Sequence, residues 1–420
     1  MGILKDKNKK SVLPDNISDL VSKDASSTTS SYLHESFNGI EITKDFWEDL
    51  WEYICDDDIT DIDYNGKALW LRNCHSNIRY KADISNKNIN PDFIDILSLR
   101  ISNSVSQELN VENPVLEAET DKLRISVVHE SVAVSGRSIC IRKTLPYTRI
   151  SIDSAIEETY ANPELLSFII NCIKAHMNIV ICGGVGVGKT ECAKFFSQYI
   201  NDNERVISIE DNLEWHYSQI KPKQDVIEMQ VSNNFDYQDA IKACLRQNPS
   251  WMMIQEIRGE EAKDFVTALS TGVNSITTLH TDDCRKVPDR IINMVSDRIG
   301  ADRMESDIFN FLDVAIMISM KVGIDGIQRR YIDQVCLFNY EGNRKNTIVV
   351  FNDGKLLSSN LPMTMLNKFN KYNIKNPFYT DELKNYASED DINVSSDDKE
   401  QFNERSNSNT NTDKQLRTII

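Results

Sequence analysis

The chain has 420 residues and a formal charge of −17, and 40 % of its residues are hydrophobic. This composition is typical of a globular protein of two or three domains, and no apolar run approaches the ~18 residues of a membrane helix. The strong negative charge argues against binding of nucleic acid by the surface as a whole, although it leaves open a local basic groove. The start of the sequence lacks the apolar stretch of a signal peptide, so we expect a cytoplasmic protein without direct nucleic-acid contacts.

The nine cysteines of the sequence contain no C-x-x-C pair, and their number is odd. Zinc ribbons and redox dithiols depend on that spacing. We therefore expect reduced thiols, most of them buried, and no zinc.

Both ends of the sequence are polar and poor in apolar residues, so we predict that they are disordered. The first such segment covers residues 1–36, and the second, which is acidic, covers residues 388–420. Between them, hydrophobic periodicity indicates two ordered domains. We place the boundaries as follows: an α+β domain at 37–145, a linker at 146–160, a mainly parallel α/β domain at 161–355 and a C-terminal extension at 356–387.

The first domain combines helices and strands. Large apolar residues recur at helical spacing over 46–54, and the pattern over 91–109 is also helical. Alternating apolar residues around Asn65-Gly66 predict a hairpin over 59–71. Two further strands are predicted at 123–128 and 138–142.

The second domain alternates helices and strands, which is the pattern of a parallel sheet. The predicted helices cover 163–176, 189–201, 236–246, 260–271, 285–297 and 303–312. The strands between them are predicted at 177–182, 206–210, 251–256 and 274–280. Three last strands, which we expect to be antiparallel, are predicted near 314–320, 328–338 and 346–351.

A glycine-rich motif follows the first strand of the second domain. It fits G-x-x-x-x-G-K-[ST] with a strand before it and a helix after it, as a phosphate-binding loop requires. Glycines let the backbone N–H groups turn inward as an anion nest, and the next helix directs the positive end of its dipole at the phosphates. We expect the lysine to reach the β- and γ-phosphates and the threonine to hold Mg²⁺. The residues predicted to bind nucleotide are Gly183, Gly184, Val185, Gly186, Val187, Gly188, Lys189, Thr190 and Glu191.

Polar side chains stand at the ends of the strands that follow this loop. Glu256 ends an apolar strand in the manner of a Walker B acid, Glu210 ends the preceding strand, and His280 ends the next. Each alone is more often a surface charge or a structural hydrogen-bonding group, but ligands of open α/β sheets bind at this shared edge. We therefore predict that Glu256 and Glu210 position water and, with Thr190, bind the metal ion. His280 is suited to sensing the γ-phosphate.

Taken together, these motifs resemble the secretion ATPases of type II and type IV systems, over about residues 40–350. A short N-terminal domain without a tetracysteine zinc insert is most similar to the tight-adherence pilus and conjugation-type branch. The segments that carry the resemblance are the glycine-rich loop and residues 60–66, 136–143, 204–214, 245–249, 256–262, 271–280 and 325–335.

The resemblance implies a RecA-like domain behind an α+β N-terminal domain, in a homo-hexamer that hydrolyses ATP with Mg²⁺. It also implies action at the inner face of the cytoplasmic membrane, on an inner-membrane platform protein, to assemble a pilus or power secretion. Arginines of the N-terminal domain contact the phosphates in that family, and the matching positions are Arg124 and Arg142. Two departures, Val273 in place of a histidine and Gln255 in place of a glycine, favour slow turnover or stimulation by a partner.

Three alternatives stay open from the sequence alone. One is a nucleotide-binding scaffold with little turnover, which the departure at Val273 favours. Another is a different P-loop enzyme, such as a motor acting on nucleic acid or a small-molecule kinase. The third is a pilus-retraction motor of the same family, because the sequence does not separate assembly from retraction.

Overall fold

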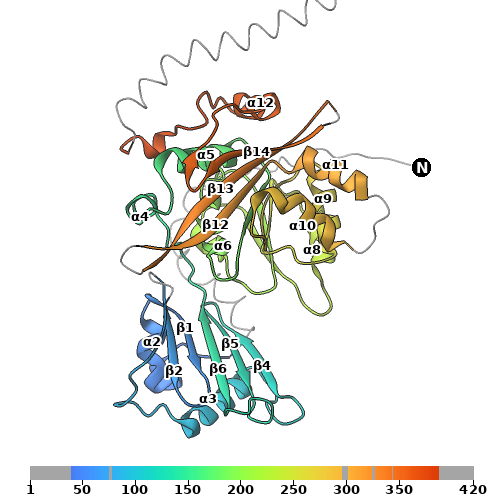
Figure 1. The fold of residues 1–420 in the computed structure, drawn as a ribbon. Coiled ribbons are helices and arrows are strands. Elements are labelled where there is room, and N and C mark those ends of the chain that lie inside the picture. The colour runs from blue at the N-terminus through green and yellow to red at the C-terminus, as the bar shows by residue number, and fades with distance from the viewer. Residues whose placement is uncertain (1–38, 75–77, 296–300, 324–326, 343, 387–420) are drawn as a thin grey trace, which may run out of the picture.

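The computed structural model describes residues 39–74, 78–295, 301–323, 327–342 and 344–386. The two segments predicted to be disordered, residues 1–36 and 388–420, lie outside these ranges. The described chain builds a six-stranded and a nine-stranded sheet. Within it, no helix has both the length and the apolar character needed to cross a membrane. Figure 1 shows the smaller sheet below the larger one, with the chain passing upward after β6 (Ser138–Lys143).

The six-stranded sheet is antiparallel and belongs to the N-terminal part of the chain. Its strand order is β3 (Arg79–Lys81), β2 (Leu69–Asn73), β1 (Ile59–Tyr64), β6, β5 (Leu123–Val128) and β4 (Val115–Glu119). The helical segments of this region are α1 (Lys44–Trp47), η1 (Glu48–Leu50), α2 (Trp51–Cys55) and α3 (Pro91–Ser104). The predicted hairpin is confirmed as β1–β2, whereas the short strands β3 and β4 were not predicted.

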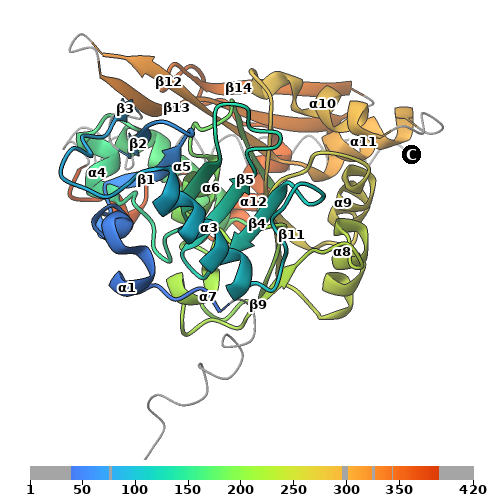
Figure 2. The same ribbon diagram turned by 90° about the horizontal axis from the view of Figure 1, so that it is seen from below.

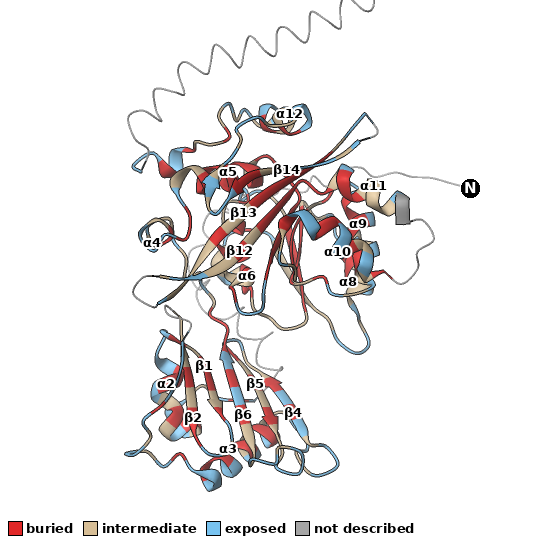
Figure 3. Ribbon diagram, in the orientation of Figure 1, coloured by how far each residue is buried: buried red, intermediate tan, exposed pale blue. Residues whose placement is uncertain are grey.

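Strand alternation gives this sheet one apolar and one polar face. Ile125 and Ile141 are buried in a core with Trp47, while their neighbours Arg124 and Arg142 belong to the opposite face. Figure 3 shows the alternation as short red and pale segments along β5 and β6. The polar face is therefore free to supply charged side chains to another part of the molecule.

The nine-stranded sheet forms the centre of the second domain. Its strand order is β15 (Lys355–Leu356), β14 (Arg344–Asn352), β13 (Gln328–Glu341), β12 (Val314–Val322), β7 (Ile179–Gly183), β11 (Asn274–Leu279), β10 (Trp251–Ile254), β8 (Val206–Glu210) and β9 (Val226–Gln230). The six strands from β12 to β9 are parallel, and β13 to β15 continue the sheet in antiparallel fashion. The predicted parallel core and antiparallel end are thus confirmed.

Helices cover both faces of this sheet, as the alternation along β7 requires. Ile179 and Ile181 pack into one core, and Val180 and Cys182 pack into the other. Figure 2 shows α8 to α11 gathered on the side away from α5 and α6. The helices on the first face are α5 (Pro163–Lys174) and α6 (Lys189–Ser197). Those on the second face are α8 (Tyr237–Arg246), α9 (Glu261–Leu269), α10 (Val287–Met294) and α11 (Ala301–Phe311).

The segments before and after this sheet pack on its first face. The predicted linker contains a short helix, α4 (Ile152–Glu157), whose Ala155 is buried in that core. In the predicted C-terminal extension, α12 (Met363–Lys371) buries Phe369, and its ring centroid lies 6.1 Å from that of Phe168. The described part of the extension is therefore built into the second domain. The remaining short elements are α7 (Tyr217–Ile220), η2 (Cys284–Lys286) and η3 (Asp381–Leu383).

Candidate functional site

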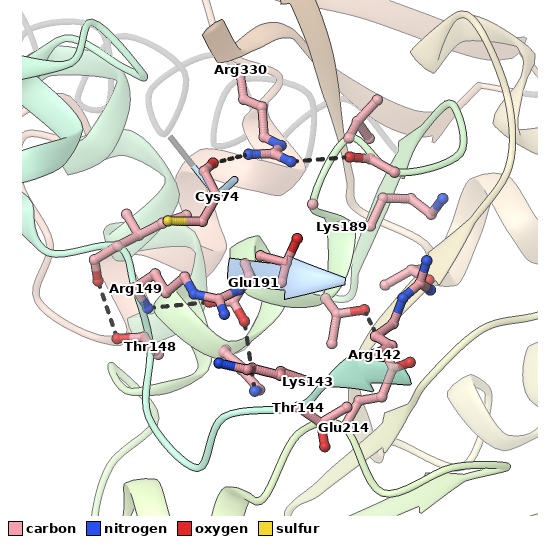
Figure 4. Close-up of a pocket in the computed structure, with 18 of the residues that line it drawn as sticks. Cys74, Arg142, Lys143, Thr144, Thr148, Arg149, Lys189, Glu191, Glu214 and Arg330 are labelled. Carbon is pink, nitrogen blue, oxygen red and sulfur yellow. Dashed lines mark hydrogen bonds and ion pairs between the residues drawn. The ribbon is translucent and has the colours of Figure 1, made fainter. Parts of the chain in front are cut away.

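A cavity of about 700 Å³ lies between the two sheets. Its walls come from the N-terminal sheet, the segment between the domains, the glycine-rich loop, the strand ends beyond β8, β10 and β11, and β13. Ten of the side chains that line it are Lys or Arg and eight are Asp or Glu, in a chain whose formal charge is −17. The cavity is therefore a locally basic site in an acidic protein, which suits an anionic ligand. Figure 4 shows basic side chains approaching it from several elements.

The glycine-rich loop curls between β7 and α6. Gly186 and Gly188 have φ angles of 75° and 93°, a region that favours glycine. At Gly183, with φ at 147°, a Cβ atom would lie 2.5 Å from the carbonyl oxygen of Ile318. Of the nine predicted residues, those from Val185 to Glu191 line the cavity. The carbonyl groups of the other two, Gly183 and Gly184, accept hydrogen bonds from the Lys189 ammonium.

Lys189 begins a hydrogen-bonded chain that crosses the strand ends. Its Nζ atom donates to Nδ1 of His280 at 3.0 Å, and Nε2 of His280 lies 3.1 Å from Oε1 of Glu256. A neutral imidazole with its proton on Nε2 satisfies both contacts. Arg258 donates to Glu256 at 2.9 Å and to Asp211 at 2.8 Å. Burial lowers the pKa of Lys189, so an anion bound beside it would restore its preference for the charged form.

The structure does not bring Glu210 to the cavity. Its carboxylate is fully buried and accepts the backbone N–H groups of Glu214 at 2.8 Å and Trp215 at 2.9 Å. Burial raises the pKa of Glu210 to about 8 despite these two hydrogen bonds. Glu214 instead lines the cavity, and its Oε2 accepts a hydrogen bond from the Thr190 hydroxyl at 3.2 Å. Glu210 thus supports the backbone of the residue that stands beside Thr190.

The two arginines predicted in the N-terminal domain do line the cavity. Arg124 and Arg142 are directly opposite each other on β5 and β6. Nε of Arg142 donates to Oδ1 of Asp61 at 3.0 Å, and Asp61 is itself buried. The ion pair fixes the direction of the Arg142 side chain, which is half exposed to the cavity.

Besides Arg124, Arg142 and Arg258, four further arginines line the cavity although the sequence singled out none of them for it: Arg72, Arg149, Arg329 and Arg330. They come from β2, from the segment between the domains and from β13, so no local motif unites them. Arg330 bridges the domains, because it donates to the carbonyl of Cys74 at 2.9 Å and to that of Gly186 at 3.4 Å. The Arg329-Arg330 pair at the start of the predicted strand over 328–338 was the one signal in the sequence.

The two departures from the family pattern have different positions. Gln255 lines the cavity, and its side-chain oxygen accepts the N–H of Asp211 at 2.9 Å, which ties the ends of β8 and β10 together. Val273 is buried in the core just before β11, at the amino end of that strand, and does not line the cavity. The polar contact that Val273 lacks is therefore one outside the cavity.

The comparisons with known proteins agree with this architecture. The model of the family described as "Type II/IV secretion system protein" matches residues 107–365. An uncharacterised protein of Bacillus anthracis is 29 % identical over 267 residues, which are 63 % of this chain and 60 % of that protein. The type IV secretion system protein VirB11 of Brucella suis is 26 % identical over 298 residues, 62 % of this chain and 80 % of that protein. The match to the first of these relatives thus spans less than two thirds of its length.

Solved structures share the fold. The ATPase DotB of Yersinia pseudotuberculosis aligns with a TM-score of 0.54 at 17 % identity, covering 68 % of this chain and 76 % of that one. The pilus retraction motor PilT with bound ADP aligns with a TM-score of 0.52 at 18 % identity, covering 75 % and 83 %. This likeness supports a RecA-like α/β domain behind an α+β N-terminal domain. Since the family model covers more than half of its length, the chain belongs to the type II/IV secretion system protein family.

Proposed function

We propose that this protein is an ATP hydrolase that powers a type II or type IV secretion or pilus machine. The observation that carries the proposal is the chain of contacts from Lys189 through His280 to Glu256, at one end of a basic cavity. A phosphate-binding lysine, a polar sensor and a carboxylate in contact are the groups that hydrolysis of a nucleoside triphosphate needs. Arg124 and Arg142 add fixed positive charge from the other domain.

Mg²⁺ fits the residues beside the loop. Mg²⁺ prefers oxygen ligands, keeps several waters and is usually held by one or two protein groups together with substrate phosphates. The Thr190 hydroxyl and the Glu214 carboxylate offer such oxygens within hydrogen-bond distance of each other. In the described residues no group of three or more His, Cys, Asp or Glu side chains is arranged to hold a metal ion. Bound there, Mg²⁺ would neutralise phosphate charge.

The remaining residues receive roles from their positions. Glu256 orients the attacking water, Lys189 holds the β- and γ-phosphates, and His280 responds to the presence of the γ-phosphate. Glu210 keeps the loop that carries Glu214 in place, in contrast to the direct metal ligand predicted from the sequence.

The assembly is proposed from the family. We propose a homo-hexameric ring at the inner face of the cytoplasmic membrane, acting on a platform protein of the tight-adherence or conjugation type. The names of relatives, which include a type IV secretion system protein VirB11 and a putative conjugal transfer protein of Mycobacterium tuberculosis, support the secretion or conjugation machine. The ring and its place at the membrane are proposed from the family resemblance alone. The acidic charge of the chain is the reason to expect no direct nucleic-acid substrate.

A second candidate, a nucleotide-bound scaffold with low turnover, is favoured by one observation. Both carboxylate oxygens of Glu256 are engaged, one with His280 and one with Arg258. These two contacts compete with a water for the carboxylate oxygens, so turnover of the isolated protein is expected to be slow. A membrane partner that opens one of these contacts of Glu256 would raise the turnover.

Phosphate release from ATP by the purified chain tests the proposal. Lys189→Ala and Glu256→Gln should each abolish release, with Lys263→Ala and Glu112→Gln as controls because both of those side chains are exposed. Hydrolysis at the wild-type rate by either site variant would sink the proposal. Wild-type protein that binds ATP without releasing phosphate, with and without membrane partners, would select the scaffold.

A further inference from the structure

The segment between the domains is fixed along α6, the helix that begins in the glycine-rich loop. One of the residues that hold this segment is Lys194, a lysine with only 2 % of its surface exposed. Three hydrogen bonds hold the segment against α6. Lys194 Nζ donates to the Leu145 carbonyl at 2.7 Å, Gln198 Nε2 donates to Thr148 Oγ1 at 3.3 Å, and the backbone N–H of Arg149 donates to Glu191 Oε2 at 3.2 Å.

Arg149 is held by this arrangement with its guanidinium in the wall of the cavity. Its Nε and Nη2 atoms are buried and have no hydrogen-bond acceptor within the part of the chain that the structure describes. Buried donors without acceptors are costly and rare, so a turn of the side chain that brings them to an anion in the cavity would be favourable. A guanidinium is the side chain best matched to phosphate oxygens, since it presents its donors in a rigid plane.

The position of Arg149 indicates which part of a nucleotide it would meet. Lys189 reaches the β- and γ-phosphates in such loops, and here it contacts His280. The backbone N–H of Arg149 instead donates to Glu191, which follows Thr190 in the first turn of α6. Figure 4 shows Arg149 near Glu191 and apart from Lys189. Because the loop backbone cradles the α- and β-phosphates, this end of the cavity corresponds to the α-phosphate.

We propose that Arg149 is a nucleotide-binding residue that contacts the α-phosphate end of the nucleotide. The proposal rests on the proposed function, because it assumes that a nucleotide fills the cavity. It adds a third source of phosphate contacts, the segment between the domains, to the loop and the N-terminal sheet. Since α6 holds the same segment, the glycine-rich loop and Arg149 would contact a bound nucleotide as parts of one rigid unit.

Titration calorimetry with ADP, AMP and a non-hydrolysable ATP analogue tests the proposal. Arg149→Met should weaken binding of all three about tenfold, and Arg149→Lys should lose less because it keeps the charge. Arg142→Met should weaken the ATP analogue more than ADP. Arg303→Met is the matched control, since that side chain is 89 % exposed on α11.

The outcomes separate the two proposals. Arg149→Met protein that binds ADP and AMP as tightly as wild type would overturn the inference, as would a loss confined to the ATP analogue. Wild-type protein that binds no nucleotide would overturn both. Wild-type protein that binds nucleotide but never hydrolyses it would overturn the proposed function alone, and the Arg149 comparison would still stand. If Arg149→Met does not fold, the nucleotide affinities of Arg149→Lys are compared with those of the wild type instead.

Discussion

The Lys189 ammonium lies 3.0 Å from Nδ1 of His280, so the phosphate-binding loop and the end of β11 are joined directly. Through Nε2 the same imidazole reaches Glu256, the carboxylate at the end of β10. One chain of hydrogen bonds therefore links the start of α6 to the residues that follow β11 and β10. Any anion that draws Lys189 away must change the hydrogen bonding of the other two.

His280→Ala tests this connection. Without the imidazole, Glu256 is no longer linked to Lys189, so we expect turnover to fall about a hundredfold. Affinity for ADP should stay near the wild-type value, because the loop itself is intact. Steady-state phosphate release and ADP titration measure the two effects. His129→Ala, which removes an imidazole that does not line the cavity, should leave both unchanged. An ADP affinity that falls in parallel with turnover would contradict the prediction.

Glu210 predicts a pH dependence of stability. Burial raises its pKa from 4.5 to about 8, so the folded state holds the proton over a range in which the unfolded state releases it. The resulting stabilisation is fully present below pH 4.5 and is lost as the pH rises through about 8. Relative to Glu210→Gln, the wild type should therefore lose about 2–4 kcal/mol of unfolding free energy between pH 5 and pH 8.

Denaturant unfolding of both proteins across that pH range measures the difference. The glutamine oxygen can still accept the N–H groups of Glu214 and Trp215, so the variant is expected to fold. A difference that is constant with pH, or that grows in favour of the wild type, would show that Glu210 is ionised in the folded protein.

Asp61→Asn tests how Arg142 is oriented. The Asp61 carboxylate accepts from Nε of Arg142 at 3.0 Å and lies 3.7 Å from Nε of Arg72. Neutralising it removes the ion pair and leaves Arg142 only a neutral acceptor, which should lower kcat/KM for ATP about tenfold through looser orientation. Asp63→Asn is a matched control, because Asp63 pairs with Arg79 and does not line the cavity. Equal effects of the two substitutions would indicate a general change in the sheet.

Lys368→Met tests whether the C-terminal extension stabilises the second domain. Asp313 is fully buried, and the Lys368 ammonium donates to both of its carboxylate oxygens at 2.6 Å. Loss of the partner leaves a buried carboxylate, but Lys368 is 38 % exposed, so water moderates the cost to about 1–3 kcal/mol. Thermal unfolding should show the loss, and adding Asp313→Asn should recover part of it. If the double variant loses as much stability as the two single variants added together, Lys368 and Asp313 do not interact in the folded protein.

The sequence predicted most reliably what is determined by neighbours along the chain. The loop from Gly183 to Thr190 has its own spacing and its own φ requirements, and it stands where the pattern placed it. The strand-end position of Glu256 followed from the apolar run over 251–254, and His280 stood at the end of the strand predicted over 274–280.

The features that the sequence did not predict depend on contacts between segments that are distant along the chain or on the path of a single turn. Glu210 and Glu214 both follow β8, and only the turn between them decides which carboxylate is buried and which meets Thr190. Arg149 has no pattern around it, because its place is set by the helix α6 packed against it. The extension beyond β14 was separated from the domain because its apolar residues, such as Phe369, are sparse in sequence and gather only on the finished core.

The fixation of residues 145–149 to α6 leaves very little chain with which the two domains can pivot. On one side, Thr144 still continues the N-terminal sheet through its N–H bond to the Lys122 carbonyl at 2.8 Å. On the other, the Leu145 carbonyl is already held by Lys194. Pro146 fixes its own φ and restricts the residue before it. A rotation of one domain relative to the other must therefore be concentrated in a few backbone torsion angles around Thr144, which makes this residue a short hinge.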